Sequence, residues 1–271
     1  MSSDFFSPLD YNEFGFYHHM PDSVVEENSL GYYLKNNAIE TYSYVSPKYE
    51  GRYRIGEFID SSLMFFANGK EYFTLKLPQD ENYLYNSKIL KERGFLKSHL
   101  DISVMEWSEK STEKLQPLTA LSTKKITTKT VKLWVDVFFD AFSYPKNLRR
   151  YISSMVEQQI EVGIDFFVGF LNELDVSCFC SFDDNNYTGL YGVGTRKRFQ
   201  RRGYAKVMLS NYMRQLQVEE TKKDLKFCLQ TYLGSGAERL YALLGFERVF
   251  VQKRFDWDPA LSLENLPFSD F

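Results

Sequence analysis

A short basic segment with a central glycine is the part of this sequence best suited to bind an anion. It reads Gln200-Arg201-Arg202-Gly203-Tyr204-Ala205 and lies between a predicted strand and a predicted amphipathic helix over residues 204–218. The amides at a helix start have no partner within the helix, and the helix dipole adds partial positive charge there. Gly203 lets a ligand approach the backbone closely, and Ala205 keeps the first turn narrow. We therefore predict a phosphate-binding turn at these residues.

Positive charge gathers around this turn, although the chain is slightly acidic overall. The chain has 33 Lys and Arg residues against 36 Asp and Glu residues, which gives a net charge of −3. It therefore has no general electrostatic attraction for nucleic acid or acidic lipid. Taken alone, the turn also fits an ordinary helix start with solvated arginines. The cations near the turn are Arg196, Lys197, Arg198, Arg201, Arg202 and Lys206.

The elements on either side of the turn alternate between strands and helices. Hydrophobic periodicity and turn residues predict each of them. Before the turn we expect a strand over residues 115–121, helices over 128–142 and 148–162, a hairpin of 165–171 with 176–182, and a strand over 187–195. After the helix at 204–218 we expect a strand over 227–232, a short helix over 236–244 and a strand over 246–255.

In this order and spacing, the chain resembles the Gcn5-related N-acetyltransferase family, abbreviated GNAT. Residues 200–205 fit the family's (Gln/Arg)-x-x-Gly-x-(Gly/Ala) pyrophosphate loop. Ala237-x-x-Leu240-Tyr241-x-x-x-Gly245-Phe246 fits its second motif. The resemblance covers residues 115–257, about half of the chain. It implies an α+β (mixed α/β) fold in which helices flank a central mixed sheet with splayed strands.

The resemblance implies acetyl-CoA as co-substrate, bound where two parallel strands separate. The pantetheine arm would pair with main-chain groups of Val193, Gly194 and Thr195. The implied reaction is direct attack of an amine, on an unknown small molecule or peptide, on the thioester, with strand amides such as that of Val193 stabilising the oxyanion. The pyrophosphate would lie on the main-chain amides of Gln200, Arg201, Arg202, Gly203, Tyr204, Ala205 and Lys206.

Tyr241 is the candidate for a chemical role. In the family, a Tyr at this position lies near the coenzyme sulfur, where its hydroxyl can donate a proton to the leaving thiolate. The alternative interpretation is a core aromatic on a short helix. Family members commonly carry Asn three residues before the Ala of this motif, where this chain has Gly234, and Ser235 is the candidate replacement.

The general base that the reaction needs is not identified. Glu173, Asp183 and Asp184 lie near predicted strand ends, but all three fit solvated turn carboxylates better than a catalytic base. The three histidines, His18, His19 and His99, have no neighbouring ligands at a spacing typical of zinc, so we expect no metal.

The N-terminal half contains an echo of the second motif. Residues 86–95 align with 237–246, so that Gly94-Phe95 matches Gly245-Phe246, and Leu90 stands in the place of Tyr241. We predict a tandem chain with a degenerate GNAT-like domain at residues 1–110, a polar linker at 108–114 and a GNAT domain at 115–271. No basic glycine loop precedes the echo, so we expect this half to bind no coenzyme and to wall the substrate cleft. Chance similarity over ten residues is the alternative.

The N-terminal elements are predicted from composition and turn residues. We expect an irregular arm over the first thirty residues and a helix over 82–93 ending at Gly94. Strand-like residues occur at 40–45, 52–58, 71–77 and 95–107.

The cysteine spacing, the apolar stretches and the first ten residues give expectations for cellular location and partners. Cys178 and Cys180 are two residues apart in a predicted strand, a spacing that suits packing on one face rather than a disulfide. Apolar stretches are shorter than a bilayer requires, and residues 1–10 lack the pattern of a signal peptide. We expect a cytoplasmic, unprocessed protein that binds neither membrane nor nucleic acid and exists as a monomer or homodimer.

Three other functions remain open at this point. The chain can be a non-catalytic acyl-CoA-binding regulatory module, since the Asn is missing and no base is identified. It can transfer a bulkier acyl or aminoacyl group, as other tandem chains of this fold do. Nucleic-acid binding through residues 196–206 is disfavoured by the acidic charge balance.

Overall fold

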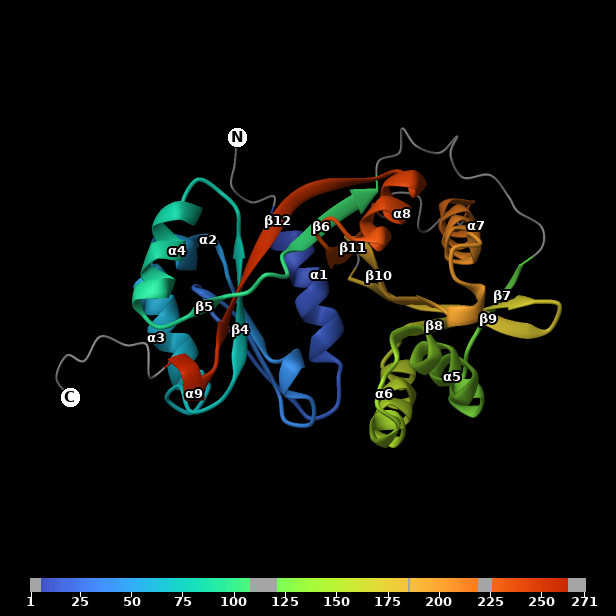
Figure 1. Cartoon of the computed structure of the whole chain (residues 1–271), viewed down its shortest axis with the longest axis horizontal. Coiled ribbons are helices and arrows are strands. Elements are labelled where there is room, and N and C mark those ends of the chain that lie inside the picture. The colour runs from blue at the N-terminus through green and yellow to red at the C-terminus, as the bar shows by residue number, and fades with distance from the viewer. Residues whose placement is uncertain (1–5, 108–120, 185, 219–225, 263–271) are drawn as a thin grey trace. The chain divides into compact units, whose positions relative to one another are not determined.

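The computed structural model describes residues 6–107, 121–184, 186–218 and 226–262 (Figure 1). The chain divides into two compact units. The first unit comprises Met1–Val104, Thr231–Leu233 and Val249–Phe271, and the second unit comprises Met105–Gln230 and Gly234–Arg248. Strands β6 (Ile102–Trp107), β11 (Lys226–Tyr232) and β12 (Phe246–Trp257) have residues in both units.

The first unit has a mixed sheet with the strand order β1-β2-β3-β4-β12. Neighbouring strands are antiparallel except β3 and β4, which are parallel, and β5 pairs with β12. The strands are β1 (Ser23–Glu27), β2 (Gly31–Asn36), β3 (Tyr44–Pro47), β4 (Phe73–Pro78) and β5 (Leu96–Lys97). The helical segments are α1 (Phe6–His18), η2 (Glu40–Tyr42), α2 (Tyr49–Tyr53), α3 (Ile55–Phe65), α4 (Tyr83–Glu92) and α9 (Pro259–Ser262).

Two buried clusters hold the first unit together. Phe58 of α3 and Leu90 of α4 pack with strand residues such as Leu75 in an apolar core. A separate cluster joins Phe14 of α1 to Tyr32, Leu34 and Tyr44. Leu34 and Tyr33 are neighbours in β2 but belong to different clusters, so α1 lies on the face of the sheet opposite to α3 and α4.

The second unit has a sheet with the order β11-β10-β9-β8-β7. All neighbours are antiparallel except β10 and β11. The strands are β7 (Ser122–Lys125), β8 (Asp165–Leu171), β9 (Leu174–Asp183), β10 (Tyr187–Thr195) and β11 (Lys226–Tyr232). The helical segments are η4 (Thr128–Thr130), α5 (Val131–Phe142), η5 (Lys146–Leu148), α6 (Arg149–Glu161), η6 (Lys197–Phe199), α7 (Tyr204–Val218) and α8 (Gly236–Leu244).

Helices cover both faces of the second unit's sheet, with α5 and α6 on one side and α7 and α8 on the other (Figure 1). Successive residues of β8 show why. Phe166 lies edge-on to Trp134 of α5 at 5.0 Å between ring centroids, whereas Phe167 lies 4.9 Å from Tyr212 of α7. Alternate strand residues point to opposite faces, so two neighbouring aromatics fill two separate cores.

Most predicted elements from residue 71 onward are confirmed, including the hairpin of β8 and β9, the strand β10 and the helices α4 to α8. The prediction of a strand over 52–58 is wrong, because Arg52 and Tyr53 end α2 and residues 55–58 begin α3. Its buried residues Ile55, Phe58, Ile59 and Ser62 have the spacing of a helix, which the high aromatic content concealed.

Two other N-terminal predictions need correction. The first thirty residues are not an irregular arm, since they contain α1 and β1. Within the strand predicted over residues 40–45, Glu40–Tyr42 form the short helix η2, and only Tyr44 and Val45 are in a strand, β3. The predicted strand at 115–121, except for its last residue, and the predicted linker at 108–114 lie outside the described residues.

Candidate functional site

The parallel strands β10 and β11 pair only at their beginnings. Three pairs join them, from Tyr187 with Lys226 to Gly189 with Cys228. From Leu190 onward β10 has no described partner on that side. Main-chain groups along this edge are therefore open to a ligand that can pair with them as a strand does.

The open strand also carries a bulge on its other side. The register of β10 with β9 shifts between Tyr191 and Gly194, so that Gly192 and Val193 are not paired with β9 residues in the strand ladder. Gly192 has φ +59°, and a Cβ on it would lie 3.1 Å from the Trp134 ring. The bulge therefore requires glycine both for backbone conformation and for close packing of α5.

Beyond the bulge, the alternation of the strand decides which main-chain groups face the open edge. The amide of Arg196 donates to the carbonyl of Val176 in β9 at 2.9 Å. In an antiparallel ladder the direction alternates, so Gly194 also faces β9 and Thr195 faces the open edge. A Cβ on Gly194 would lie 2.9 Å from the Cβ of Ala141 in α5, so this glycine allows close helix packing.

The segment after β10 presents a series of unpaired amides. We call residues 200–206 the glycine turn. Among the described residues, none accepts a hydrogen bond from the main-chain amides of residues 201–206. Arg201 has φ +61° and Gly203 has φ +82°. Positive φ at alternate residues turns successive amides toward one point and forms a nest for an anion.

The side chains of the glycine turn have different surroundings. Gln200 donates from Nε2 to the carbonyl of Thr195 at 3.0 Å and closes the turn onto the strand. Arg201, Arg202 and Gly203 are exposed. A Cβ on Gly203 would meet nothing within 4 Å, so its positive φ rather than crowding favours glycine there. The turn thus offers an open backbone with cations beside it.

Helix α8, which carries Tyr241, is fixed at both ends. The Ser235 Oγ accepts a hydrogen bond from the Glu238 amide at 3.1 Å and caps the helix. The Glu238 carboxylate accepts from the Gly234 amide at 2.6 Å and from Arg248 at 2.6 and 3.0 Å. Gly245 ends the helix with φ +97°.

Tyr241 is buried with the residues at which β10 and β11 separate. It is 6% exposed and belongs to the cluster that contains Leu190 and Leu229, against which Val193 packs. Burial raises the pKa of its phenol, and no hydrogen bond contributes to the shift. The hydroxyl therefore keeps its proton at neutral pH, as a proton donor must.

The acidic residues considered as a general base and the three cysteines occupy positions that fit a structural role. Asp184 accepts hydrogen bonds from the amides of Asn186 and Tyr187, and Glu173 has φ +69° between β8 and β9. Cys178, Cys180 and Cys228 are buried and form no disulfide. No group of three or more His, Cys, Asp or Glu side chains suited to a metal occurs in the part of the chain that the structure describes.

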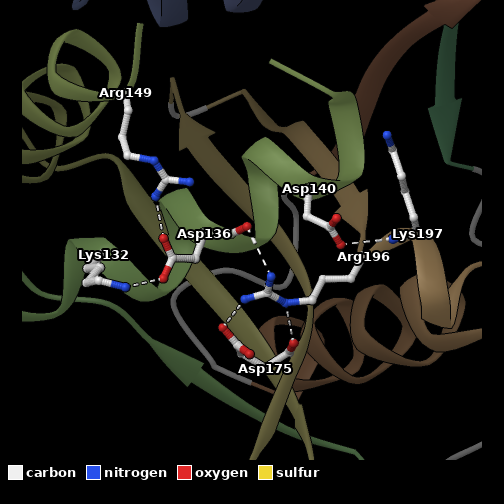
Figure 2. A network of polar contacts seen from close by, with 7 residues as sticks. All are labelled: Lys132, Asp136, Asp140, Arg149, Asp175, Arg196 and Lys197. Carbon is white, nitrogen blue, oxygen red and sulfur yellow. Dashed lines mark hydrogen bonds and ion pairs between the residues drawn. The ribbon is translucent and has the colours of Figure 1, made fainter. Parts of the chain in front are cut away.

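Sequence reasoning missed a network at the end of β10, which Figure 2 shows. Its sequence position places Arg196 among the cations of the turn, but its guanidinium binds Asp175 and the carbonyl of Asp136. These residues are far apart in sequence, so no local pattern marks them.

The solved structures most useful for comparison share this architecture. A Gcn5-related N-acetyltransferase from Kribbella flavida superimposes with a TM-score of 0.68 over 94% of this chain and 96% of that chain, at 13% identity. The chain has the GNAT fold. A tandem GNAT protein from the clavulanic acid biosynthesis pathway matches with a TM-score of 0.64 over 93% of this chain and 86% of that chain, at 10% identity.

The GNAT fold extends over most of the chain, beyond the half in which the motifs occur. A conserved protein of unknown function from Staphylococcus epidermidis also matches, with a TM-score of 0.61 over 87% of this chain and 94% of that chain, at 12% identity. No protein-family model and no curated protein matches the sequence. Among the described residues, no helix has the length and apolar character needed to span a membrane.

Proposed function

We propose that this protein is an acetyl-CoA-dependent N-acetyltransferase that binds its coenzyme on the second unit. One observation carries the proposal: the open edge of β10 is followed, after η6, by a turn whose six main-chain amides at 201–206 have no acceptor among the described residues. The first feature suits the amide groups of a pantetheine arm, and the second suits a pyrophosphate. The GNAT fold supports the same assignment.

The coenzyme would lie along β10. Its pantetheine amides would pair with main-chain groups of Val193 and Thr195, with Gly194 keeping the strand close to α5. Its pyrophosphate would accept hydrogen bonds from the amides of the glycine turn, with Arg201, Arg202 and Lys206 adding charge.

The proposed reaction forms a C–N bond and breaks the C–S bond of the thioester. The amine nitrogen attacks the carbonyl carbon, and the amide of Val193 in the bulge stabilises the oxyanion. Collapse of the intermediate releases the thiolate, to which the Tyr241 hydroxyl donates its proton, and solvent restores that proton. The attacking amine loses its own proton to water or to a base among residues not yet assigned.

A calorimetric titration with coenzyme A and acetyl-CoA tests the binding site. We expect one coenzyme per chain, and we expect Gly203→Glu to abolish binding because a carboxylate would enter the phosphate nest. Gly56→Glu, on the exposed side of a helix in the first unit, is the matched control and leaves binding unchanged. Equal affinity of the Gly203 variant and the parent protein would rule out the turn as the site.

An assay of thiol release tests the chemistry. Acetyl-CoA is incubated with panels of amines, amino acids and peptide N-termini, and acetylated products are identified by mass spectrometry. Release that depends on an amine supports the enzyme. Tight coenzyme binding with no transfer supports the second candidate, a non-catalytic acyl-CoA-binding regulatory module. Gly234 favours this candidate because it brings no side chain where GNAT enzymes commonly have Asn, and Ser235 is engaged as a helix cap.

We further propose a cytoplasmic location, because three buried cysteines without a disulfide suit a reducing compartment. The protein would act there as a monomer or homodimer on a dissolved amine.

A further inference from the structure

Arg196 stands at the junction between the open strand and the glycine turn. It follows Thr195, the last residue of β10, and precedes η6. Its Nε donates to the carbonyl of Asp175 at 2.8 Å, and its Nη2 pairs with the carboxylate of the same residue at 2.5 Å. Its Nη1 donates to the carbonyl of Asp136 at 3.3 Å. All three guanidinium nitrogens are thus used inside the protein (Figure 2).

Further contacts tie this junction to two helices. The carboxylate of Asp136 in α5 pairs with Lys132 one turn earlier and with Arg149 at the start of α6. Asp140, one turn later in α5, accepts a hydrogen bond from the amide of Lys197 at 3.1 Å. Both residues that follow the open strand are therefore attached to α5, one by its side chain and one by its main chain (Figure 2).

The junction has to be fixed by side chains because the sheet does not fix it. On one side β10 has no described partner beyond Gly189, and on the other side its pairing with β9 is interrupted by the bulge. Two of the glycine turn's residues also hold positive φ values. A strand end with so few main-chain constraints moves freely unless other groups hold it.

Arg196 differs from the other cations near the turn in burial and in partners. Its side chain is 18% exposed and that of Asp175 is 23% exposed. Arg198 and Arg202 instead lie over the ring of Phe199, at 4.7 and 5.9 Å from its centroid, and both are exposed. Only the exposed cations have guanidinium groups open to an incoming anion.

We propose that Arg196 is a positioning residue that fixes the end of β10 and the start of the glycine turn without touching the coenzyme. The inference rests on the proposed coenzyme site. Arg196 and Asp175 act as one unit, since each is the other's charged partner. Lys cannot replace Arg196, because one ammonium group does not reproduce the planar set of donors that reaches a carboxylate and two carbonyls.

Calorimetry with coenzyme A separates positioning from direct attraction. We expect Arg196→Ala, Arg196→Lys and Asp175→Asn each to weaken affinity about tenfold. The loss should be the same at low and high salt, because no charge on the coenzyme is left unpaired. Arg202→Ala should weaken affinity mainly at low salt, since it removes an exposed charge that salt screens. Arg150→Ala, an exposed arginine of α6, is the control and leaves affinity unchanged.

A double variant tests whether Arg196 and Asp175 act together, and thermal unfolding tests whether each variant folds. The double variant Arg196→Ala/Asp175→Asn should be no weaker than either single variant, as expected for partners in one interaction. Asp140→Asn removes the charge that accepts the Lys197 amide, and this contact is more exposed than that of Arg196 with Asp175. We expect Asp140→Asn to weaken coenzyme affinity by a smaller factor than the Arg196 variants do. Thermal unfolding identifies any variant that fails to fold, and Asp140→Asn then carries the test.

Hydrogen exchange of the free protein tests the positioning role of Arg196 without any coenzyme. Arg196→Ala should make the hydrogen-bonded amides of Arg196, Lys197, Phe199 and Gln200 exchange about tenfold faster, with β7 and β8 unchanged. Unchanged exchange would overturn the positioning role. If the parent protein binds no coenzyme, the proposed function fails while the exchange result still decides this inference. If the parent protein binds and the Arg196 variants bind equally well, this inference fails and the function stands.

Discussion

At the scale of single residues, Tyr241 combines burial with a proton held at neutral pH. Its position in the cluster with Leu190 and Leu229 places the ring beside the point at which β10 and β11 part. A buried neutral phenol with no hydrogen bond affecting its pKa is suited to donate to a newly formed thiolate. Phe would fill the same space as the Tyr241 ring. A substitution by Phe therefore tests the hydroxyl alone.

We expect Tyr241→Phe to lower turnover about 100-fold while coenzyme affinity stays the same, because general acid catalysis acts in the transition state. The measurement is kcat for amine-dependent thiol release beside calorimetry with coenzyme A. Tyr85→Phe, an exposed tyrosine of the first unit, serves as the control. Full turnover in the Tyr241 variant would reduce this residue to a packing role.

Asp10 in the first unit is a second residue whose protonation matters, here for stability. Its carboxyl accepts a hydrogen bond from Gln252 at 2.7 Å and lies near Glu13, which pairs with buried Lys76. Burial, followed by repulsion from Glu13, raises the pKa of Asp10 from 3.8 to about 7. The folded protein therefore keeps this proton over a pH range in which the unfolded chain loses it.

The direction of the pH dependence of stability follows from this difference in bound protons. The stabilising contribution of Asp10 is complete below pH 3.8 and is lost as the pH rises toward about 7. The loss is at most about 4 kcal/mol. We expect Asp10→Asn, which keeps an acceptor for Gln252, to stabilise the protein above pH 7 and to flatten this part of the pH profile. Urea unfolding across this range measures it, with the exposed Asp60→Asn as control, and an unchanged profile would contradict the expectation.

At the scale of elements, two glycines in neighbouring helices of the first unit have opposite reasons for being there. A Cβ on Gly51 in α2 would lie 2.0 Å from the carbonyl oxygen of Leu30, which is backbone and cannot move aside. A Cβ on Gly56 in α3 would meet nothing within 4 Å. The first glycine permits α2 to pass close to the turn before β2, and the second is only a poor helix former.

We therefore expect Gly51→Ala to destabilise the protein by about 3 kcal/mol through overpacking, and Gly56→Ala to stabilise it by about 1 kcal/mol. Urea unfolding of both variants measures the pair under identical conditions. The same substitution with opposite outcomes tests the close approach of α2 and Leu30 directly. Similar effects of both variants would show that this contact is absent.

For the molecule as a whole, the two units contain a similar arrangement of parallel strands and helices. They differ in the turn that follows the first strand of the parallel pair. Each contains a parallel strand pair, β3 with β4 and β10 with β11, with helices between the two strands. In the first unit Gly51 is packed against Leu30, and Arg52 pairs with Asp80 at 3.0 Å with side chains 3% and 11% exposed. The corresponding turn is filled by the protein itself, which supports the expectation of one coenzyme per chain.

The division of the chain into a degenerate N-terminal domain and a working C-terminal domain stays a prediction. The compact units do not follow chain order, since Val249–Phe271 belongs with the N-terminal residues. Strand β12 pairs with β4 from Gln252 with Pro78 to Trp257 with Phe73. The last long strand of the chain thus completes the sheet of the first unit.

Local residue types encode the features of this fold that depend on neighbouring residues. The glycine turn, the strand before it, helix α7 and the Gly-Phe end of α8 were all predictable, because backbone conformation and helix ends are governed by local residue types. The resemblance to GNAT proteins rested on those segments and is confirmed for the fold.

The tertiary structure is what shows which polar and charged residues pair with one another. Arg196 and Asp175 are 21 positions apart, and Gln252 and Asp10 are 242 positions apart. It also decided that residues 52–58 are helical, because burial of Ile55 and Phe58 against the sheet outweighs their strand propensity. Partners brought together by folding leave no periodic trace in the chain, so no local pattern can reveal them.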